Sequence, residues 1–588
     1  MHINAFLNRH DQTGVWPTCA CGKKRVLFLV GVSVALLLSP SVSHGADQSS
    51  GTTTTSQSDG QGAAPAANAN GTNGATANPP APVQHFFIRE IRVEGGEHLV
   101  PRVDVEAAVY PYLGPYRTVS DVESARAALQ KVYMDKGYQT VAVQIPAQSP
   151  QQVKSGVIYL EVVPNQVGQL RINGSRFYSL DEIRREAPSL AEGTVPNFND
   201  VSHDIVGLNQ LPDRRITPSI GPGHAPGTVD VDLNVKDTMP LHGSLELNNR
   251  YSADTTRLRL NGSFDYDNLW QLGHTIGGSF QLSPEKPSEV KVFSGFYQAR
   301  IPDMDWLTLM VDGTKQDSNV NTLGGIGVAG KGDIIGLHAI MNLPALSDKD
   351  TGQNFYHSVS LGFDYKHFAQ DVTIAGNPTI TPVTYYPLSA AYSGTWVGKG
   401  YETAFNPSVN LSFRGLSNGQ QVFEENRHNS DGNFIYFRSD LSHTRDLPEG
   451  LQLFAKAQGQ VADEPLVNSE QFSGGGLGTV RGYLESEELG DNAIFESVEL
   501  RSPSLGGLAG KTVDDWRFYL FSDNGWLTIN SPLLGQQVNY VMESVGAGMR
   551  FQLLDHLNGS LDFAVPLRSA TTTTSFSDVL TFRVWAEF

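Results

Sequence analysis

Apolar and polar residues alternate along the chain after Asp237, in segments of about ten residues, the length that a tilted strand needs to cross a bilayer. In RLRLNGSFDY one face carries Leu258, Leu260, Gly262, Phe264 and Tyr266, and the other carries Arg257, Arg259, Asn261, Ser263 and Asp265. SVGAGMRFQLL, residues 544–554, alternates in the same way. A period of two predicts strands with one apolar face, in a transmembrane β-barrel or in a soluble sandwich.

The last residues favour the barrel. TFRVWAEF ends the chain inside a strand pattern with Phe582, Val584, Ala586 and Phe588 on one face, whereas soluble domains more often end in frayed polar residues. At about 20 residues for each strand with its connection, the chain after Asp237 predicts an antiparallel transmembrane β-barrel of roughly sixteen strands over residues 238–588.

Before Asp237 the pattern changes to two consecutive α/β units, residues 86–164 and 165–237. In the first, FFIREIRVEGG predicts a strand, and Ser120 to Glu123 predicts a capping box that opens a helix ending at Gly137. Strands are expected at 139–146 and 156–163. The second unit repeats this order with a strand at 168–174, a capping box at 179–182, a helix at 199–211 and a closing strand pair that ends with 227–237. Two tandem units of one architecture indicate a modular arm.

The first 85 residues predict a targeting sequence followed by a linker. Lys23, Lys24 and Arg25 precede an apolar run over 26–38 that is too short to span a bilayer, so residues 1–45 are expected to be a secretory signal peptide. Both cysteines, Cys19 and Cys21, fall within it, so no disulfide is predicted. Residues 46–85 are rich in Thr, Ser, Gly, Ala, Asn and Pro and are expected to form a low-complexity linker.

Charge and motifs argue against several functions. Without residues 1–45 the chain has 38 basic and 60 acidic residues, a net charge of −22 that excludes nucleic acid as an expected partner. The G-x-G-x-x-G match at 325–330 lacks a surrounding βαβ unit and is interpreted as a flexible loop or turn. The scattered histidines, His357, His367, His428 and His443, lack metal-ligand spacing. We therefore expect no enzymatic activity, no catalytic residues, no cofactor and no metal.

Two short motifs, whose residues Arg481 and Asp523 are 42 positions apart, carry the most specific signal. The first is Val480-Arg481-Gly482-Tyr483, and the second, Phe521-Ser522-Asp523-Asn524-Gly525, has the form F-x-D-x-G. If Trp516, Phe518 and Leu520 face lipid, alternation turns Arg517, Tyr519, Phe521 and Asp523 towards the lumen. A buried guanidinium needs a partner, and a carboxylate offers a bidentate one. The alternative is that Arg481 caps an external turn and Asp523 begins another.

With these motifs, the two units and the C-terminal Phe588, the chain resembles the outer-membrane transporters of two-partner secretion over residues 86–588. The resemblance identifies the units as periplasmic POTRA domains. It also places Arg481 on a long extracellular loop that folds into the barrel. There Arg481 is expected to contact the barrel-wall motif of Phe521, Asp523 and Gly525. The resemblance further implies that Phe588 is the assembly signal read by the barrel assembly machinery, and that the barrel sits in outer-membrane lipid. Many members also have a plug helix, which residues 46–84 do not predict.

The resemblance implies a function. An unfolded secreted partner, such as an adhesin, haemolysin or toxin, is expected to add a strand to an exposed POTRA sheet edge and then pass through the barrel. Residues 139–145 and 229–235 are the candidate edges. A BamA-like insertase is the main alternative, because it would share the POTRA domains and the loop motif. A porin would explain only the barrel.

Overall fold

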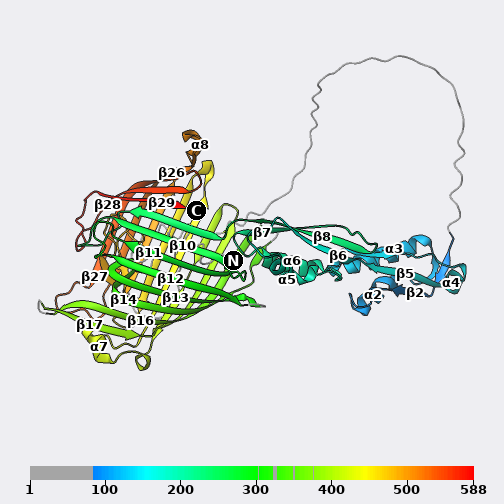
Figure 1. Cartoon of the computed structure of the whole chain (residues 1–588), viewed down its shortest axis with the longest axis horizontal. Helices are drawn as coiled ribbons and strands as arrows, with labels where there is room; N and C mark the ends of the chain where they lie inside the picture. Colours follow the sequence, from blue (N-terminus) through cyan, green and yellow to red (C-terminus); the bar gives the residue numbers. More distant parts are fainter. Residues whose placement is uncertain (1–83, 302–303, 322–326, 349–350, 375–376) are drawn as a thin grey trace, which may run out of the picture.

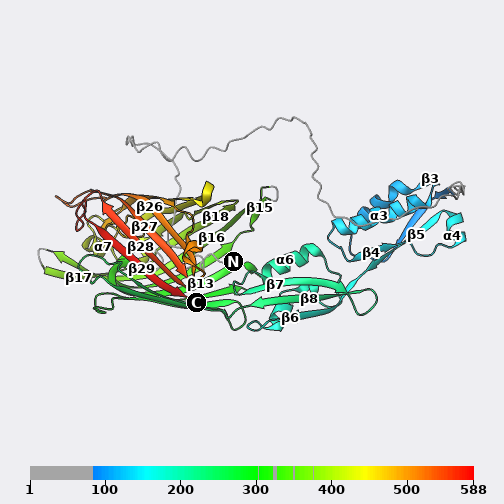
Figure 2. The same ribbon diagram turned by 90° about the horizontal axis from the view of Figure 1, so that it is seen from above.

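The chain folds into a barrel with an arm that extends from one end, as Figures 1 and 2 show. This computed structural model describes residues 84–301, 304–321, 327–348, 351–374 and 377–588. The predicted signal peptide, nearly all of the predicted linker and residues 325–326 of the G-x-G-x-x-G match lie outside the described residues. The rest of that match, residues 327–330, lies in a barrel strand, so its interpretation as a loop or turn is wrong there.

The first unit of the arm contains two small sheets, one two-stranded and one with the strand order β2-β5-β4. Its elements are β1 (Phe86–Ile88), β2 (Glu90–Glu94), α2 (Arg102–Val109), the 3-10 helix η1 (Tyr110–Tyr112), β3 (Gly114–Arg117), α3 (Val119–Asp135), β4 (Val141–Gln144), α4 (Pro150–Ser155) and β5 (Val157–Pro164). Strand β5 is central, parallel to β2 and antiparallel to β4. Helix α3 packs Val122, Leu129 and Tyr133 into an apolar core with strand residues such as Leu160.

The expected capping box is displaced by two residues. Thr118, not Ser120, is the N-cap of α3, and its hydroxyl accepts a hydrogen bond from the Asp121 backbone while the Asp121 carboxylate accepts one from the Thr118 backbone. Both sites have a Ser or Thr followed by an acidic residue three positions later, and the chain uses the one at which extended backbone from β3 meets the helix. The helix ends at Asp135, just before Gly137, which has φ of +96°.

The second unit has its own three-stranded sheet, with the order β6-β8-β7, and a separate apolar core. Its elements are β6 (Gln166–Asn173), α5 (Leu180–Arg185), the 3-10 helix η2 (Pro188–Leu190), α6 (Phe198–Leu208), β7 (Arg214–Pro222) and β8 (Thr228–Asp237). The prediction that 229–235 is a sheet edge is wrong, because β8 is the central strand. The predicted capping box at 179–182 is also wrong: Ser179 is the N-cap of α5 but its side chain makes no capping hydrogen bond.

The barrel closes through the pairing of its last strand with its first. In the described residues nineteen strand segments form the closed sheet. In three cases two consecutive segments pair with the same neighbours and are one strand with an interruption, so the barrel has sixteen strands. The segments are β9 (Leu241–Asn248), β10 (Arg259–Leu269), β11 (His274–Leu282), β12 (Lys291–Ile301), β13 (Met304–Asn321), β14 (Gly327–Asn342), β15 (Leu346–Asp348), β16 (Gln353–Ile374), β17 (Asn377–Tyr385), β18 (Leu388–Gly398), β19 (Tyr401–Phe405), β20 (Ser408–Ser412), β21 (Phe434–Asp446), β22 (Gln452–Ala462), β25 (Asn492–Arg501), β26 (Val513–Thr528), β27 (Asn539–Leu553), β28 (Leu557–Pro566) and β29 (Val579–Glu587). The closed antiparallel barrel of sixteen strands is thereby confirmed.

Short 3-10 helices, helices and one hairpin occupy the connections between barrel strands. They are η3 (Arg414–Leu416), α7 (Gln420–Asn426), η4 (Pro448–Gly450), the hairpin of β23 (Phe472–Gly474) and β24 (Glu488–Gly490), and α8 (Gly506–Ala509). No helix in the described part of the chain is long and apolar enough to cross a membrane.

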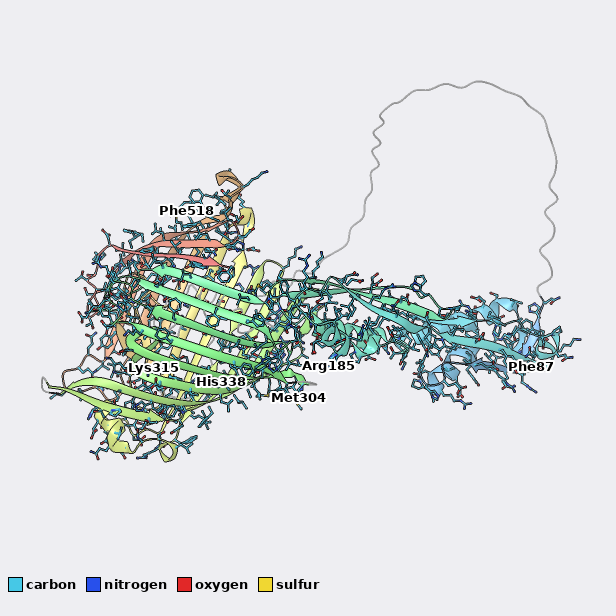
Figure 3. All side chains as sticks on the ribbon, in the orientation of Figure 1. Phe87, Arg185, Met304, Lys315, His338 and Phe518 are labelled. Carbon is cyan, nitrogen blue, oxygen red and sulfur yellow. The ribbon has the colours of Figure 1, made fainter. Side chains whose placement is uncertain are left out.

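Barrel side chains alternate between the outer surface and the lumen. On β26, Phe518 and Leu520 are exposed on the outside, and Figure 3 shows Phe518 at the barrel surface. Their neighbours Tyr519 and Phe521 are buried inside. An apolar outer face meets lipid without leaving backbone groups unpaired, because every strand is hydrogen-bonded on both sides.

The arm joins the barrel at the end that carries the shorter turns. The turn between β10 and β11 contacts the second unit: the Gln271 side-chain oxygen accepts a hydrogen bond from the Ser179 backbone at 2.8 Å, and the Asn268 amide donates to the Phe177 carbonyl at 3.3 Å. The longer connections, including residues 413–433 and 463–491, leave the opposite end. In an outer membrane the arm end is periplasmic and the long connections are extracellular.

Candidate functional site: a loop held inside the barrel

The connection between β22 and β25, residues 463–491, folds back into the lumen, and we call it the inner loop. The β23–β24 hairpin forms its stem, and its tip carries the Val480 to Tyr483 motif. Val480, Arg481 and Tyr483 are all buried, and their contacts are with inward-facing residues of the barrel wall. Arg481 therefore lies in the lumen and does not cap an external turn.

Arg481 is joined to Asp523 by three hydrogen bonds. Its guanidinium donates from Nε to Asp523 Oδ2 and from Nη2 to Oδ1, each at 2.7 Å, and its backbone N–H donates to Oδ2 at 3.0 Å. Both residues are at most 5% exposed. The planar fork of arginine matches the two carboxylate oxygens, a geometry that lysine lacks.

Two other carboxylates and one hydroxyl complete the surroundings of the guanidinium. Nη1 donates to Glu499 Oε1 at 2.6 Å and lies 3.5 Å from Asp562 Oδ1, while Nη2 donates to Ser497 Oγ at 3.1 Å. Strand register explains this convergence: Ser497 on β25 pairs directly with Asp523 on β26. Because side chains alternate, Glu499 projects from β25 into the lumen beside them.

The Phe521 ring lies against the guanidinium, 3.5 Å from Arg481 Cζ to the ring centroid. Phe521 and Asp523 are two residues apart on β26 and so point to the same side. The first and third residues of F-x-D-x-G thus act together, since one contacts the face of the arginine and the other its edge.

The remaining motif residues fit the loop against the wall. Gly482 has φ of +91°, which lets the chain turn between Arg481 and Tyr483. The Tyr483 hydroxyl accepts a hydrogen bond from the Glu543 backbone at 3.1 Å and donates to the Arg568 carbonyl at 2.8 Å. A Cβ on Gly525 would lie 2.5 Å from the Phe495 ring and 3.0 Å from Val480 Cγ2, so this glycine makes room for the loop.

Additional ion pairs balance the charge around the tip. Glu499 also contacts Arg501 at 2.7 Å and Arg550 at 3.5 Å, and Glu485 on the loop pairs with Arg250 at 2.7 Å. Lys456 on β22 donates to the Gly478 carbonyl of the loop. A polar cavity between the loop and the wall is lined by several of these residues, namely Arg250, Lys456, Glu499 and Arg550. Buried charges of both signs alternate in space, which offsets much of the cost of removing them from water.

A second attachment, at the base of the inner loop, was not predicted. Glu470 is 2% exposed, and its Oε1 accepts hydrogen bonds from Lys366 at 2.7 Å and from the Tyr385 hydroxyl at 2.6 Å, while Oε2 accepts one from the Tyr436 hydroxyl at 2.7 Å. Asp491, at the end of the loop, pairs with Arg427 just after α7 at 3.0 Å. No sequence signal marks these acids, which are single charges in polar segments.

Phe588, the predicted assembly signal, lies beside β9. Its backbone N–H and carbonyl pair with Gly243, each at 3.1 Å, and its ring lies over Gly243, where a Cβ would come within 2.4 Å of it.

The histidines that lacked metal-ligand spacing in the sequence make separate contacts in the structure: His357 bonds Tyr392, His367 bonds Thr384 and His443 bonds Thr403.

Comparison with known proteins agrees with this architecture. A family model described as "POTRA domain, ShlB-type" matches residues 86–165, and one described as "Haemolysin secretion/activation protein ShlB/FhaC/HecB" matches residues 395–551, which include both motifs. The outer membrane transporter CdiB of Dickeya dadantii (strain 3937) is 23% identical over 71% of this chain and 72% of its own length. The heme/hemopexin transporter protein HuxB of Haemophilus influenzae (strain 86-028NP) is 22% identical over 75% of this chain and 76% of its own length.

Among solved structures, CdiB from Escherichia coli has the same fold, with a TM-score of 0.58 and 19% identity over 88% of this chain and 93% of that chain. Fold and site together define a β-barrel of the outer membrane with a POTRA-containing periplasmic arm and a loop locked inside its lumen. In sequence and fold the chain resembles the outer-membrane transporters of two-partner secretion.

Proposed function

We propose that this transporter exports an unfolded partner exoprotein of the adhesin, haemolysin or toxin type from the periplasm through its barrel. The observation that carries the proposal is the inner loop, which lies in a polar lumen and is held there by hydrogen bonds and ion pairs of its side chains. A loop held in this way can move aside for a chain and return. The periplasmic arm, which continues directly into β9, is suited to collect that chain at the entrance.

We place the docking site for the partner on β2 of the first unit. Strand β4 is an edge strand as expected, but its outward side is occupied: Gln130 of α3 accepts a hydrogen bond from the Val143 backbone at 2.7 Å and donates to the Val141 carbonyl at 2.6 Å. Backbone groups that already have partners cannot bind an added strand.

The edges of the second unit are covered in a similar way. Asn209, at the end of α6, bonds both the N–H and the carbonyl of Ile216 on β7, at 2.6 and 3.0 Å. On β6, the Val167 N–H donates to the Thr194 carbonyl at 2.8 Å. For β2, by contrast, the bonds found among the described residues run to β5 and to Gly156, which leaves its other side available.

In the proposed cycle the partner docks in extended form, enters the lumen and displaces the inner loop, and folding of the partner outside the cell gives the process its direction. The chain acts as a conduit without catalysis or cofactor. Outer-membrane lipid surrounds the barrel, and the barrel assembly machinery inserts it through its C-terminal strand, which includes Phe588.

Depletion of the protein tests this function and separates it from the alternatives. We expect one large secreted protein to disappear from the culture supernatant while other outer-membrane proteins keep their levels. A general fall in outer-membrane proteins would instead indicate an insertase, and loss of small-solute uptake alone would indicate a porin.

Crosslinking tests the docking site. A photo-crosslinker at Arg92 on β2 should capture the partner, whereas one at Ala142 on the covered strand β4 should not.

A further inference from the structure

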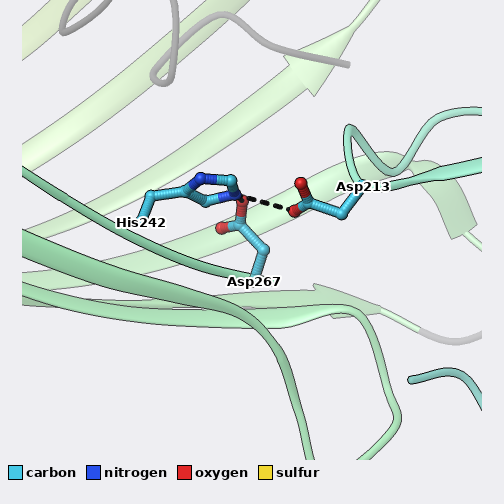
Figure 4. Close-up of side chains that lie close together, drawn as sticks. All are labelled: Asp213, His242 and Asp267. Carbon is cyan, nitrogen blue, oxygen red and sulfur yellow. Dashed lines mark hydrogen bonds and ion pairs between the residues drawn. The ribbon is translucent and has the colours of Figure 1, made fainter. Parts of the chain in front are cut away.

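A histidine and two aspartates from three separate segments meet where the arm joins the barrel, as Figure 4 shows. Asp213 precedes β7 of the second unit, His242 lies on β9 and Asp267 on β10. Within the part of the chain that the structure describes, this is the one set of three His, Cys or carboxylate residues whose ligand atoms lie within 4.8 Å of one another. His242 Nε2 is 2.9 Å from Asp213 Oδ2 and 3.8 Å from Asp267 Oδ2.

Each carboxylate is oriented by a threonine hydroxyl. Thr238 donates to Asp213 Oδ1 at 3.1 Å, and Thr275 donates to Asp267 Oδ1 at 2.9 Å. In both residues the other oxygen, Oδ2, is the one directed at His242 Nε2. Carboxylates that bind a metal through one oxygen are typically held in place by a hydrogen bond to the other oxygen, as these threonine hydroxyls provide here.

The site also has an excess of negative charge in a buried place. Asp213 and Asp267 are each only 8% exposed, and a protonated His242 would neutralise one of them. The adjacent Arg214 pairs with Glu186 at 2.6 Å, and its guanidinium lies 5.1 Å from the centroid of the Tyr178 ring. Two buried carboxylates that share one partner are costly unless a further cation joins them.

Tyr178 provides an independent indication of a missing ligand. Its hydroxyl is buried and makes no hydrogen bond to any described residue. Tyr178 lies beside the site: it follows Phe177, whose carbonyl accepts a hydrogen bond from Asn268, the residue after Asp267, and its ring faces Arg214, the residue after Asp213. A buried hydroxyl without a partner normally faces a water molecule or an ion.

We propose that Asp213, His242 and Asp267 bind a divalent transition-metal cation, with Zn²⁺ as the best match, and that the ion ties the periplasmic arm to the barrel. One imidazole nitrogen and two carboxylate oxygens suit Zn²⁺ better than Ca²⁺ or Mg²⁺, which take oxygen ligands. A water molecule would supply a fourth ligand. Because Asp213 comes from the arm and the other two from the barrel, the ion would hold the angle between them.

A second cluster of the same composition serves as an internal control. In the barrel, His338 Nε2 lies 3.2 Å from Asp312 and 3.3 Å from Asp364, but this group does not gather its ligand atoms within 4.8 Å. The two carboxylate oxygens there are too far apart for one ion to reach all three ligand atoms, so the group is an ion pair. His338→Gln should therefore leave zinc binding unchanged.

The test is zinc titration of the purified full-length protein in detergent, without a polyhistidine tag and after treatment with a chelator. We expect one equivalent of Zn²⁺ to bind, with Ca²⁺ unable to compete. Asp267→Asn should weaken binding by more than about 100-fold, since even loss of an outer partner typically costs roughly 10- to 100-fold. Thr275→Val, which keeps all three ligands, should weaken binding by about 10-fold.

A second measurement does not depend on variants. Zn²⁺ should slow protease cleavage of the wild-type protein in the 238–240 link between the arm and the barrel, and the chelator should reverse this. Wild-type protein that binds no stoichiometric zinc, or zinc binding that is equal in wild type and Asp267→Asn, would overturn the proposal and leave the cluster as an ion pair. The electrophoretic shift of the folded barrel on heating shows whether each variant is folded.

Discussion

The inner loop is attached at two places, its tip and its base, and the charges are reversed between them. At the tip the loop contributes the cation, Arg481, and the wall contributes carboxylates from β25, β26 and β28. At the base the loop contributes the carboxylate, Glu470, and the wall contributes Lys366 and two tyrosine hydroxyls from β16, β17 and β21. The loop is thus bound to two separate parts of the barrel wall.

The two attachments also differ in specificity. The tip uses a bidentate fork with an aromatic ring against its face, so a shift of one ångström would break several bonds together. At the base, Lys366 and two tyrosine hydroxyls each make one bond to the carboxylate, and no bidentate fork is present. The tip therefore sets the position of the loop, and the base keeps the loop near the lumen when the tip is released.

Exchange of charge at the tip should have the largest effect. Arg481→Asp or Asp523→Arg alone places like charges together in a buried site, and removal of one partner from such a pair typically costs about 3–5 kcal/mol. Because about 1.4 kcal/mol corresponds to a factor of ten, the closed loop should be depopulated by 100-fold or more, and secretion of the partner should fall sharply. The double exchange should recover part of both losses.

The partner protein in the supernatant and the protease sensitivity of the loop provide the measurements. Arg517→Ala is the matched control, because Arg517 lies on the same strand as Asp523 but pairs with Asp515 near the strand end, away from the loop. Normal secretion by both single variants would show that the pair has no part in transport.

Loss of charge at the base should have an intermediate effect. Glu470→Gln keeps the size of the side chain and one acceptor oxygen but removes the charge that faces Lys366, and a hydrogen bond to a charged group typically contributes about 1.5–3 kcal/mol. We expect a leakier barrel in planar bilayers, with more frequent openings, and only a several-fold change in secretion. Glu424→Gln, on the exposed side of α7, is the control and should open no more often than wild type. An unchanged opening frequency in Glu470→Gln would mean that the tip alone holds the loop.

The sequence predicted the attachment at the tip of the inner loop but not the one at its base, for a physical reason. Arg481 and Asp523 each sit in a motif with fixed neighbours, and strand alternation alone turns Asp523 inward. Glu499 also alternates inward, but its contact with Arg481 depends on the register between β25 and β26, which no local pattern specifies. Glu470 is a single acid in an irregular segment, and its partners lie up to 104 residues away.

The fold shows the same limit on prediction. Strand period and length predicted sixteen strands, since both are local properties. Helix α2 was not predicted, because it follows Pro101 and has no side-chain cap. Helix α4 was also overlooked, although Ser149 and Gln152 form a capping box that the sequence displays. The central position of β8 could not be read, because sheet order is set by packing and not by the strand itself.

The smallest effect should come from the backbone at the tip. Gly482→Ala leaves every charge in place but forces a side chain into a position with φ of +91°, where left-handed backbone typically costs about 1–2 kcal/mol for a residue with a Cβ. The new methyl would lie 3.2 Å from Ala564 Cβ, so the loop must shift slightly. Gly478→Ala is a close control, because it lies on the same loop and a Cβ added there would meet no atom within 4 Å. We expect a modest rise in protease sensitivity for Gly482→Ala and none for Gly478→Ala. Equal sensitivity in the two would show that side-chain bonds alone position the tip, and that the turn after Arg481 adds nothing.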